Sequence, residues 1–448
     1  MSWWRTVAAC VSLLSAAACT TVSNPLSCAD GFCDDPAFPF CDVDGTIGGG
    51  GRLTCIAVAC TPLAFEACRG DEAIICNATG DGYDITRCQS GCDAERAGCA
   101  ATHIVPKYLP NVCDSLATEP ALSISESITL DTSDDASCNG GVVAQVNGPE
   151  ICVLRYGSIT VERNKTFRVK GARALAMVAD GSLVIDGTLD VSANSVEHGP
   201  GGGFVELPFI PPPGQTAGFG GVGFRTAGGS GGTSTADGGA ANGSAALMDP
   251  ALLVELVSSP RGYFAGGYGG GGTGGAGGAV TLISCRGTLS VPGLIDAGGG
   301  GGSGGWAILE STISAMGGGA GGNVVLQGMM VEVTGQVFAN GGSGGAGCRT
   351  HSGNAETSQM GADGSRSTTA GAPGGSAQNL GGGDGGAGGF GDTPPAPGRR
   401  SLSGSAGGGG GGGSAGFLQT YTPPDVSPRL EAATASPSFQ PNRGLEAR

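Results

Sequence analysis

Three stretches of the chain alternate apolar and polar residues on either side of a single glycine, and this pattern restricts the fold most. A period of two places the apolar side chains on one face of a strand, and glycine permits a sharp corner between two short halves. A weaker fourth copy is predicted at Phe167, Val169 and Gly171. The aligned positions are Leu183, Ile185, Gly187, Leu189 and Val191; Leu289, Val291, Gly293, Ile295 and Ala297; and Val331, Val333, Gly335, Val337 and Ala339.

Such a unit cannot bury its apolar face alone, whereas parallel stacking of several units would bury it continuously. We therefore predict an all-β fold, an irregular right-handed parallel β-solenoid with glycine-rich loop insertions, preceded by a small disulfide-rich module. The solenoid is expected over residues 157–422. A connector and solenoid cap should occupy residues 100–156, and a loose tail rich in Pro, Ser and Ala should occupy residues 423–448.

Glycine tracts interrupt the strand pattern, and glycine accounts for 91 of the 448 residues. These tracts include Gly266–Gly278, Gly298–Gly305 and Gly407–Gly413. They offer no apolar side chains, and ordering them costs about 1–2 kcal/mol of backbone entropy per residue. We expect them to be loops, locally extended or polyproline-like, on one side of the solenoid. They lack a strict Gly-X-Y period, so a collagen triple helix is excluded.

Cysteines are concentrated in residues 28–99, where the density predicts disulfides in an exported protein. The spacing C-x4-C-x7-C occurs twice, which suggests two half-modules separated by Gly48–Gly51. Zinc is the weaker alternative, because no C-x2-C pair occurs and His103, His198 and His351 lie outside the cluster. The predicted disulfide cysteines are Cys28, Cys33, Cys41, Cys55, Cys60, Cys68, Cys76, Cys88, Cys92 and Cys99, with Cys138 and Cys152 as a further pair.

The N-terminus has the layout of an export signal, with Arg5, the apolar run Thr6–Leu14 and the small residues Ser15–Ala18 ahead of Cys19. Residues 15–19 resemble a bacterial lipobox, although Ala16 stands where leucine is usual. The resemblance implies a signal peptide over residues 1–18, a lipidated Cys19 and an anchor linker over residues 19–27. The alternative is plain secretion after cleavage behind Ala18.

The combination of lipobox, cysteine-rich segment and glycine-interrupted repeats resembles the glycine-rich surface lipoproteins of myxobacterial type. The segments that carry this resemblance are Ala176–Asn194, Ala279–Gly302 and Asn323–Gly347, with Cys68–Cys99 as a second patch. The resemblance implies an outer-membrane or cell-surface location and a membrane contact made through lipid. It implies no activity.

No group of residues predicts an enzyme, a cofactor or a resident metal. The net charge of −16 argues against nucleic-acid binding. The G-x-S-x-G matches in the glycine tracts lack the strand and helix that a nucleophile needs. Asp186, Asp190 and Asp296 fall near the corner glycines, where aspartate commonly stabilises turns.

We therefore expect a non-catalytic, lipid-anchored surface protein with a structural or adhesive role, in contact with cells, polysaccharide or matrix. A carbohydrate-active solenoid enzyme is one alternative, since the three aspartates could share one face. A largely disordered glycine-rich spacer is the other.

Overall fold

The computed structural model divides the chain into two compact units, residues 1–102 and residues 103–448. Apart from one 3-10 turn, Asp135–Ser137, all elements of the described residues are β-strands, so the predicted all-β class is confirmed. No helix within the described ranges is long and apolar enough to cross a membrane. The structure describes residues 27–28, 31–43, 45, 51–57, 59–61, 63–70, 72–77, 80–87, 92–94, 98–99, 103–145, 148–205, 217–234, 265, 267–270, 274–308, 311–349, 356–378, 381–403, 406–442 and 444–447.

The first unit consists of short antiparallel strands joined by disulfides. One hairpin pairs β1 with β2, a three-stranded sheet has the order β3-β4-β5, and β6 pairs with β7. These strands are β1 (Phe40–Asp42), β2 (Thr54–Ile56), β3 (Phe65–Arg69), β4 (Glu72–Cys76), β5 (Tyr83–Arg87), β6 (Cys92–Asp93) and β7 (Gly98–Cys99).

Among the described residues, the disulfides of the first unit form two interleaved pairs. Cys28–Cys41 and Cys33–Cys55 interleave first, and Cys60–Cys76 and Cys68–Cys92 repeat the arrangement. The disulfide repeat therefore begins at Cys28 and Cys60, whereas the C-x4-C-x7-C spacing of the sequence begins at Cys28 and Cys55. As a result, the glycines at 48–51 fall inside the first half-module instead of between the halves. Cys88 lies outside the described residues.

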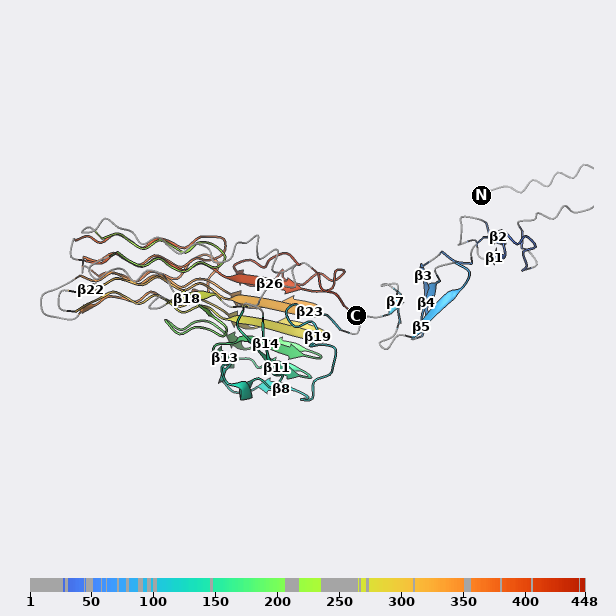
Figure 1. Cartoon of the computed structure of the whole chain (residues 1–448), viewed down its shortest axis with the longest axis horizontal. Coiled ribbons are helices and arrows are strands. Elements are labelled where there is room, and N and C mark those ends of the chain that lie inside the picture. Colours follow the sequence, from blue (N-terminus) through green and yellow to red (C-terminus); the bar gives the residue numbers. More distant parts are fainter. Residues whose placement is uncertain are drawn as a thin grey trace, which may run out of the picture. The chain divides into compact units, whose positions relative to one another are not determined.

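In the second unit most strands stack in parallel on three faces. The long strands β19 and β23 each run from the first face onto the second, with an irregular register between Ser284 and Thr288. The first face contains β11, β14, the first halves of β19 and β23, and β26; the second contains β8, β12, β15 and the second halves of β19 and β23; the third contains β9, β13, β16, β20, β24 and β27. Figure 1 shows this stack rising from β8 to β26.

These strands have the following bounds: β8 (Leu122–Ile124), β9 (Ile128–Asp131), β10 (Val142–Val143), β11 (Ile151–Tyr156), β12 (Ile159–Val161), β13 (Thr166–Lys170), β14 (Ala174–Ala179), β15 (Leu183–Ile185), β16 (Thr188–Asp190), β17 (Gly203–Val205), β18 (Tyr268–Gly270), β19 (Ala279–Val291), β20 (Leu294–Asp296), β21 (Trp306–Ile308), β22 (Ser311–Ile313), β23 (Asn323–Val333), β24 (Gln336–Phe338), β25 (Glu356–Thr357), β26 (Phe417–Tyr421) and β27 (Thr434–Ser436).

The alternation in the sequence matches the interior of this stack. Leu189 pairs with Ile295, which pairs with Val337, and all three side chains are buried in one apolar core. The corner glycines also stack: a Cβ on Gly293 would lie 2.1 Å from the Gly187 carbonyl oxygen, and one on Gly335 would lie 2.0 Å from that of Gly293. Only glycine lets successive corners approach this closely, so the alignment on glycine was correct.

The predicted fourth copy has the wrong register. Phe167 pairs with Leu189, so Phe167 and Val169 occupy the second half of their unit instead of the first. The first half is β12, which pairs with β15. A turn over residues 162–165 takes the place of the corner glycine, and the glycine alignment therefore could not detect it.

The glycine tracts lie on one side of the stack, as expected, but they are not surface loops. Nine glycine-rich segments, as far as the structure describes them, pack against one another and are joined by hydrogen bonds. We call them the glycine array, and it extends away from the strands in Figure 1. The array comprises residues 193–205, 217–234, 265–278, 297–305, 314–322, 339–348, 357–378, 381–401 and 406–416.

Hydrogen bonds in the array repeat every three residues. In residues 406–416, Gly407, Gly410 and Gly413 donate to residues 348, 345 and 342, while the intervening N–H groups donate to two other segments, around residues 219–222 and 396–399. Three further segments, around residues 229–232, 383–389 and 318–321, donate back. A three-residue period is that of a polyproline II helix. This segment is thus surrounded by six neighbours.

Six-fold packing leaves no space for side chains along residues 408–413. A Cβ on any of these six glycines would lie 1.9–2.1 Å from a carbonyl oxygen of a neighbouring segment. Segments nearer the surface have a larger residue at every third position, as at Asp384, Ala387 and Phe390. The glycine content therefore reflects how many neighbours each segment has, and backbone hydrogen bonds offset the entropy cost that had predicted loops.

The tail is also ordered, which differs from the loose tail predicted for residues 423–448. Strand β27 adds to the third face, and Leu445 is buried while its N–H donates to Thr422. The Gln440 N–H in the tail also donates to the Leu418 carbonyl in β26, so the tail covers this end of the stack.

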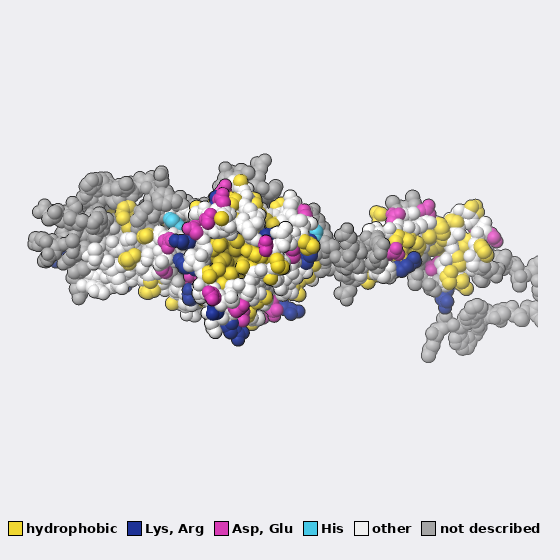
Figure 2. All heavy atoms as spheres, turned by 90° about the horizontal axis from the view of Figure 1, so that it is seen from below, with side chains coloured by type: hydrophobic (Ala, Val, Ile, Leu, Met, Phe, Trp, Pro, Cys, Tyr) yellow, Lys and Arg dark blue, Asp and Glu magenta, His cyan; other side chains and the backbone are white. Residues whose placement is uncertain are grey.

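At its other end the stack begins earlier than residue 157, at β8 and β9, and is open. Leu122, Ile128 and Leu130 are paired with core positions, yet Ile128 is 44% exposed and the other two are only partly buried. Figure 2 views the molecule from this side and shows hydrophobic side chains with charged ones around them. The predicted cap over residues 100–156 thus leaves the edge of β8 and β9 uncovered within the described structure.

Candidate functional site

A polar pocket of about 440 Å³ lies where the third face meets the glycine array. Arg168, Asp190 and Asp296 come from three successive strands, β13, β16 and β20, and their pairing places them one above the other. Each alternates with interior residues of its strand, so the three side chains emerge on the outer surface of the face. Asp363 and Arg366, from the array, complete the charged lining.

Both stacked carboxylates are paired with arginine. The Arg168 guanidinium donates to Asp190 at 2.5 Å, and Ser192 donates to the other Asp190 oxygen through its N–H and its hydroxyl. Arg366 Nε donates to Asp296 at 2.7 Å, and the Gly298 N–H donates to its second oxygen. Burial raises the pKa of the Asp296 carboxyl, and the Arg366 guanidinium opposes that rise.

Asp186, the third aspartate considered from the sequence, does not join this pocket. It lies on the other side of Gly187 from Asp190 and forms an ion pair of 3.3 Å with Arg163, whose side chain is 75% exposed. The structure therefore brings together two of the three predicted aspartates, and it supplies each of them with a cation that the sequence did not indicate.

The outer part of the pocket carries groups that can still form hydrogen bonds. Asp363 accepts the N–H groups of Ser195 and Gly301 through one oxygen. Asn194 and Arg366 line the pocket and are exposed, and Arg366 contacts Asp296 through Nε. Carboxylate, amide and guanidinium groups around a shallow space suit a hydroxyl-rich ligand such as a saccharide.

Twelve cysteines were predicted to form disulfides, and ten of them do so among the described residues. Cys138–Cys152 is confirmed, and Cys113 pairs with Cys285 across 172 residues. Cys28, Cys33 and Cys55 are the one group of possible metal ligands within the described residues, but their sulfurs are bonded in two disulfides. Thiolates are needed for zinc, so this cluster is structural. The six disulfides mark an exported protein.

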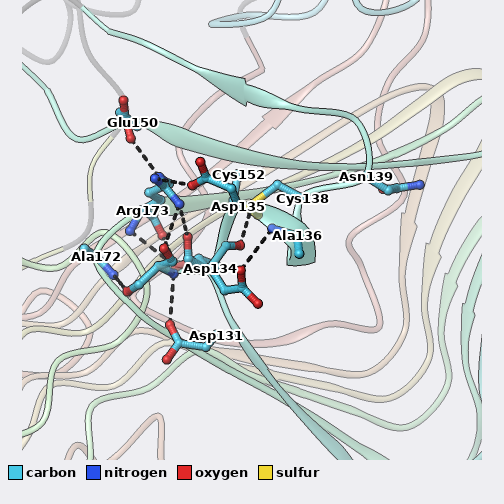
Figure 3. Close-up of a disulfide and its surroundings, with 12 residues drawn as sticks. Asp131, Asp134, Asp135, Ala136, Cys138, Asn139, Glu150, Cys152, Ala172 and Arg173 are labelled. Carbon is cyan, nitrogen blue, oxygen red and sulfur yellow. Dashed lines mark hydrogen bonds and ion pairs between the residues drawn. A yellow bond between two sulfur atoms is a disulfide. The ribbon is translucent and has the colours of Figure 1, made fainter.

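The Cys138–Cys152 disulfide lies beside an ion-pair cluster centred on Arg173. Figure 3 shows the Arg173 guanidinium between Glu150 and Asp135. The ion pair with Glu150 measures 2.7 Å and the one with Asp135 measures 2.6 Å. It also donates to the carbonyl oxygens of Thr132 and Ser133. These contacts tie the turn before β10 to the strands, and they give this cluster a structural role.

The predicted lipidation residue, Cys19, and His351 lie outside the described residues. His103 lies 3.2 Å from Asp114. His198 is half-buried: its Nδ1 accepts the Ala276 N–H at 2.9 Å, and burial lowers its pKa below 6.5.

No family model, curated protein or solved structure matches this chain. Its site must therefore be interpreted from its own geometry. Sequence reasoning missed Arg168, Asp363 and Arg366. Arg168 could have been found, because it lies between the alternating residues Phe167 and Val169; the other two reach the pocket only through the array.

Proposed function

We propose that this protein is a non-catalytic, lipid-anchored protein of the bacterial outer membrane or cell surface. In this proposal the strand stack is an irregular right-handed β-solenoid that carries the glycine array as a rigid arm, for structural or adhesive contact with cells, polysaccharide or matrix. One observation carries it: the glycine tracts are buried and hydrogen-bonded to one another instead of serving as flexible linkers. A packed arm of this kind speaks against a disordered spacer.

Contact with polysaccharide would use the polar pocket. Asn194, Asp363 and Arg366 offer an amide, a carboxylate and a guanidinium at its outer rim. Such groups bind sugar hydroxyls through several individually weak hydrogen bonds, which is adequate for an adhesin that meets repeated units of a polymer.

A carbohydrate-active enzyme remains the second candidate, because Asp190 and Asp296 occupy paired positions on adjacent strands. A glycosidase needs one carboxyl that gives up a proton and one that stays ionised. Here an arginine and backbone or hydroxyl donors already engage both groups, which favours binding. Incubating the full chain with a polysaccharide panel decides this: turnover that is lost in Asp190→Asn and Asp296→Asn would establish the enzyme.

Fractionation of cells that express the full chain tests the anchor. Triacylation at Cys19 should hold the protein in the membrane fraction, since each buried methylene contributes about 0.8 kcal/mol, and Cys19→Ser should abolish this retention. Mass spectrometry of the mature N-terminus is the direct control. A mature protein that begins at Cys19 without added lipid would replace anchoring by simple secretion.

A further inference from the structure

Residues 103–117, which we call the strap, enter the second unit across the outer surface of the first face. Ile104 and Leu109 are buried there in an apolar cluster with residues of β11, β14, β19, β23 and β26. The Ile104 N–H donates to the Cys285 carbonyl in β19, and the Lys107 N–H donates to the Gln327 side chain in β23. The strap therefore spans several strands before the chain reaches β8.

One covalent bond and several polar contacts fix the end of the strap. Cys113 is joined to Cys285, and both residues are fully buried. The Arg286 guanidinium donates to the Cys113 carbonyl at 2.9 Å, and the Ala117 N–H donates to Asp180 at 2.6 Å. Asp180 itself lies between Arg155 and Arg286.

The position of this disulfide matters because β8, which follows Cys113, and β19, which contains Cys285, pair with different numbers of neighbouring strands. Past Cys113 the chain enters β8, which among the described residues pairs on one side only and begins the open end of the stack. Cys285 lies in β19, which pairs with β14 and β15 on one side and with β23 on the other. An edge strand can be peeled away one hydrogen bond at a time, whereas a central strand must break two ladders together.

We infer that the strap and the Cys113–Cys285 disulfide form a mechanical clamp, which passes tension from the N-terminal side directly to β19 and keeps it from the open end. Tension could peel residues 103–112, but the disulfide stops the process at Cys113. Residues 114–284, which include β8 to β18 and the first residues of β19, then form a closed loop that carries no load. The inference rests on the proposed function only for the direction of the load, which a lipid anchor near Cys19 would supply.

Single-molecule force spectroscopy on the full chain tests the clamp. One handle is attached at Ala101, ahead of the strap, and the other at the exposed Arg400 in the array, each through a clickable unnatural residue. With the disulfide intact, the low-force release should not exceed residues 103–112 of the strap, roughly 10 residues or about 3.5 nm, before a single high-force rupture. A longer low-force release would overturn the clamp, and this result needs no variant.

The double variant Cys113→Ala, Cys285→Ala provides the comparison. It should lose the strands from β8 onward in several lower-force steps and should release the chain between the two positions, a sequence separation of 172 and roughly 60 nm more than wild type. The matched control is Cys138→Ala, Cys152→Ala, which removes the disulfide of the same region that lies off the load path.

The control should keep the wild-type rupture force. An equal fall in rupture force in both double variants would overturn the clamp, because a general loss of stability would then explain the effect. Unchanged steps in the Cys113 and Cys285 variant would also overturn it. If Cys19→Ser does not abolish membrane retention, the proposed lipid anchor is refuted, but the force curves of the clamp are unaffected. The failure of the proposed function and the failure of the clamp are therefore distinguishable.

Discussion

Replacing Gly410 by alanine tests whether the glycine array is packed as closely as the structure shows. An added Cβ would lie 1.9 Å from the Met316 carbonyl oxygen, whereas real Cβ atoms stay beyond 3.0 Å. The segment must therefore move by more than 1 Å. Gly410 donates to Gly345 at 2.9 Å and accepts from Gly386 at 2.8 Å, and a shift of that size takes at least one of these bonds out of range.

The cost has three parts. Overpacking costs about 1–3 kcal/mol, and each buried hydrogen bond left unmade costs about 1–3 kcal/mol more. Alanine also reduces the entropy of the unfolded chain, which offsets about 0.4–1 kcal/mol. With one bond lost, the middle values of these ranges sum to about 3 kcal/mol and the upper values to about 5 kcal/mol, which is the expected net loss in the free energy of unfolding. For a unit of about 350 residues, with about 2.1 cal/mol/K of unfolding entropy per residue, this corresponds to a fall in Tm of about 4–7 °C.

Calorimetry and circular dichroism of the full chain measure this change, with Gly181→Ala as the matched control. Gly181 lies in the strand stack, and the nearest atom to its added Cβ, the Gly157 carbonyl oxygen, is 3.4 Å away, which is ordinary contact. The control should shift the Tm by about 1 °C or less. Equal shifts for the two variants, or none for Gly410→Ala, would show that the array is not packed as described.

Three further results are expected. Val333→Asp places a carboxylate in the apolar core and should cost several kcal/mol in a thermal melt, whereas Glu332→Ala on the outer side should be nearly silent; equal effects would contradict the assigned faces. Deleting Gly410 alone rotates the rest of its segment by a third of a turn, whereas deleting residues 409–411 keeps the three-residue period. The single deletion should therefore lower the Tm more than the triple deletion, and a larger fall for the triple deletion would refute the period. His198 has a folded pKa below its unfolded value, so stability should be complete above pH 6.5 and fall as pH drops below it, and His198→Asn should flatten this dependence in urea titrations at several pH values.

The strand stack was predictable because its signal is local. Apolar residues alternate around Gly187, Gly293 and Gly335, and burial of one face follows from that alternation wherever the units stack. The register failed where a turn over residues 162–165 replaced the glycine, since nothing in that turn marks the corner. Part of the pocket was predictable, because Asp190 and Asp296 occupy the same position in successive repeats and the sequence alone shows this.

The array was not predictable from composition, because its bonds join segments far apart in sequence. Gly410 is bonded to Gly345 and Gly386, and neither partner can be inferred from the tract itself. The entropy argument for loops was sound for an isolated tract, and it fails when six neighbours supply the missing partners. A usable signal did exist: glycine pairs recur with one larger residue between them, as around Ser343 and Ala346.

The array should also respond to temperature in its own way. Most of its buried surface is backbone amide, and exposing polar surface lowers the heat capacity, whereas exposing apolar surface raises it. The unfolding of the array should therefore contribute far less heat capacity per residue than the apolar core of the strand stack. Apolar burial loses strength on cooling, but a lattice held by amide hydrogen bonds does not depend on that term. The arm should thus have a flatter stability curve than the stack that carries it, and it should remain ordered in the cold.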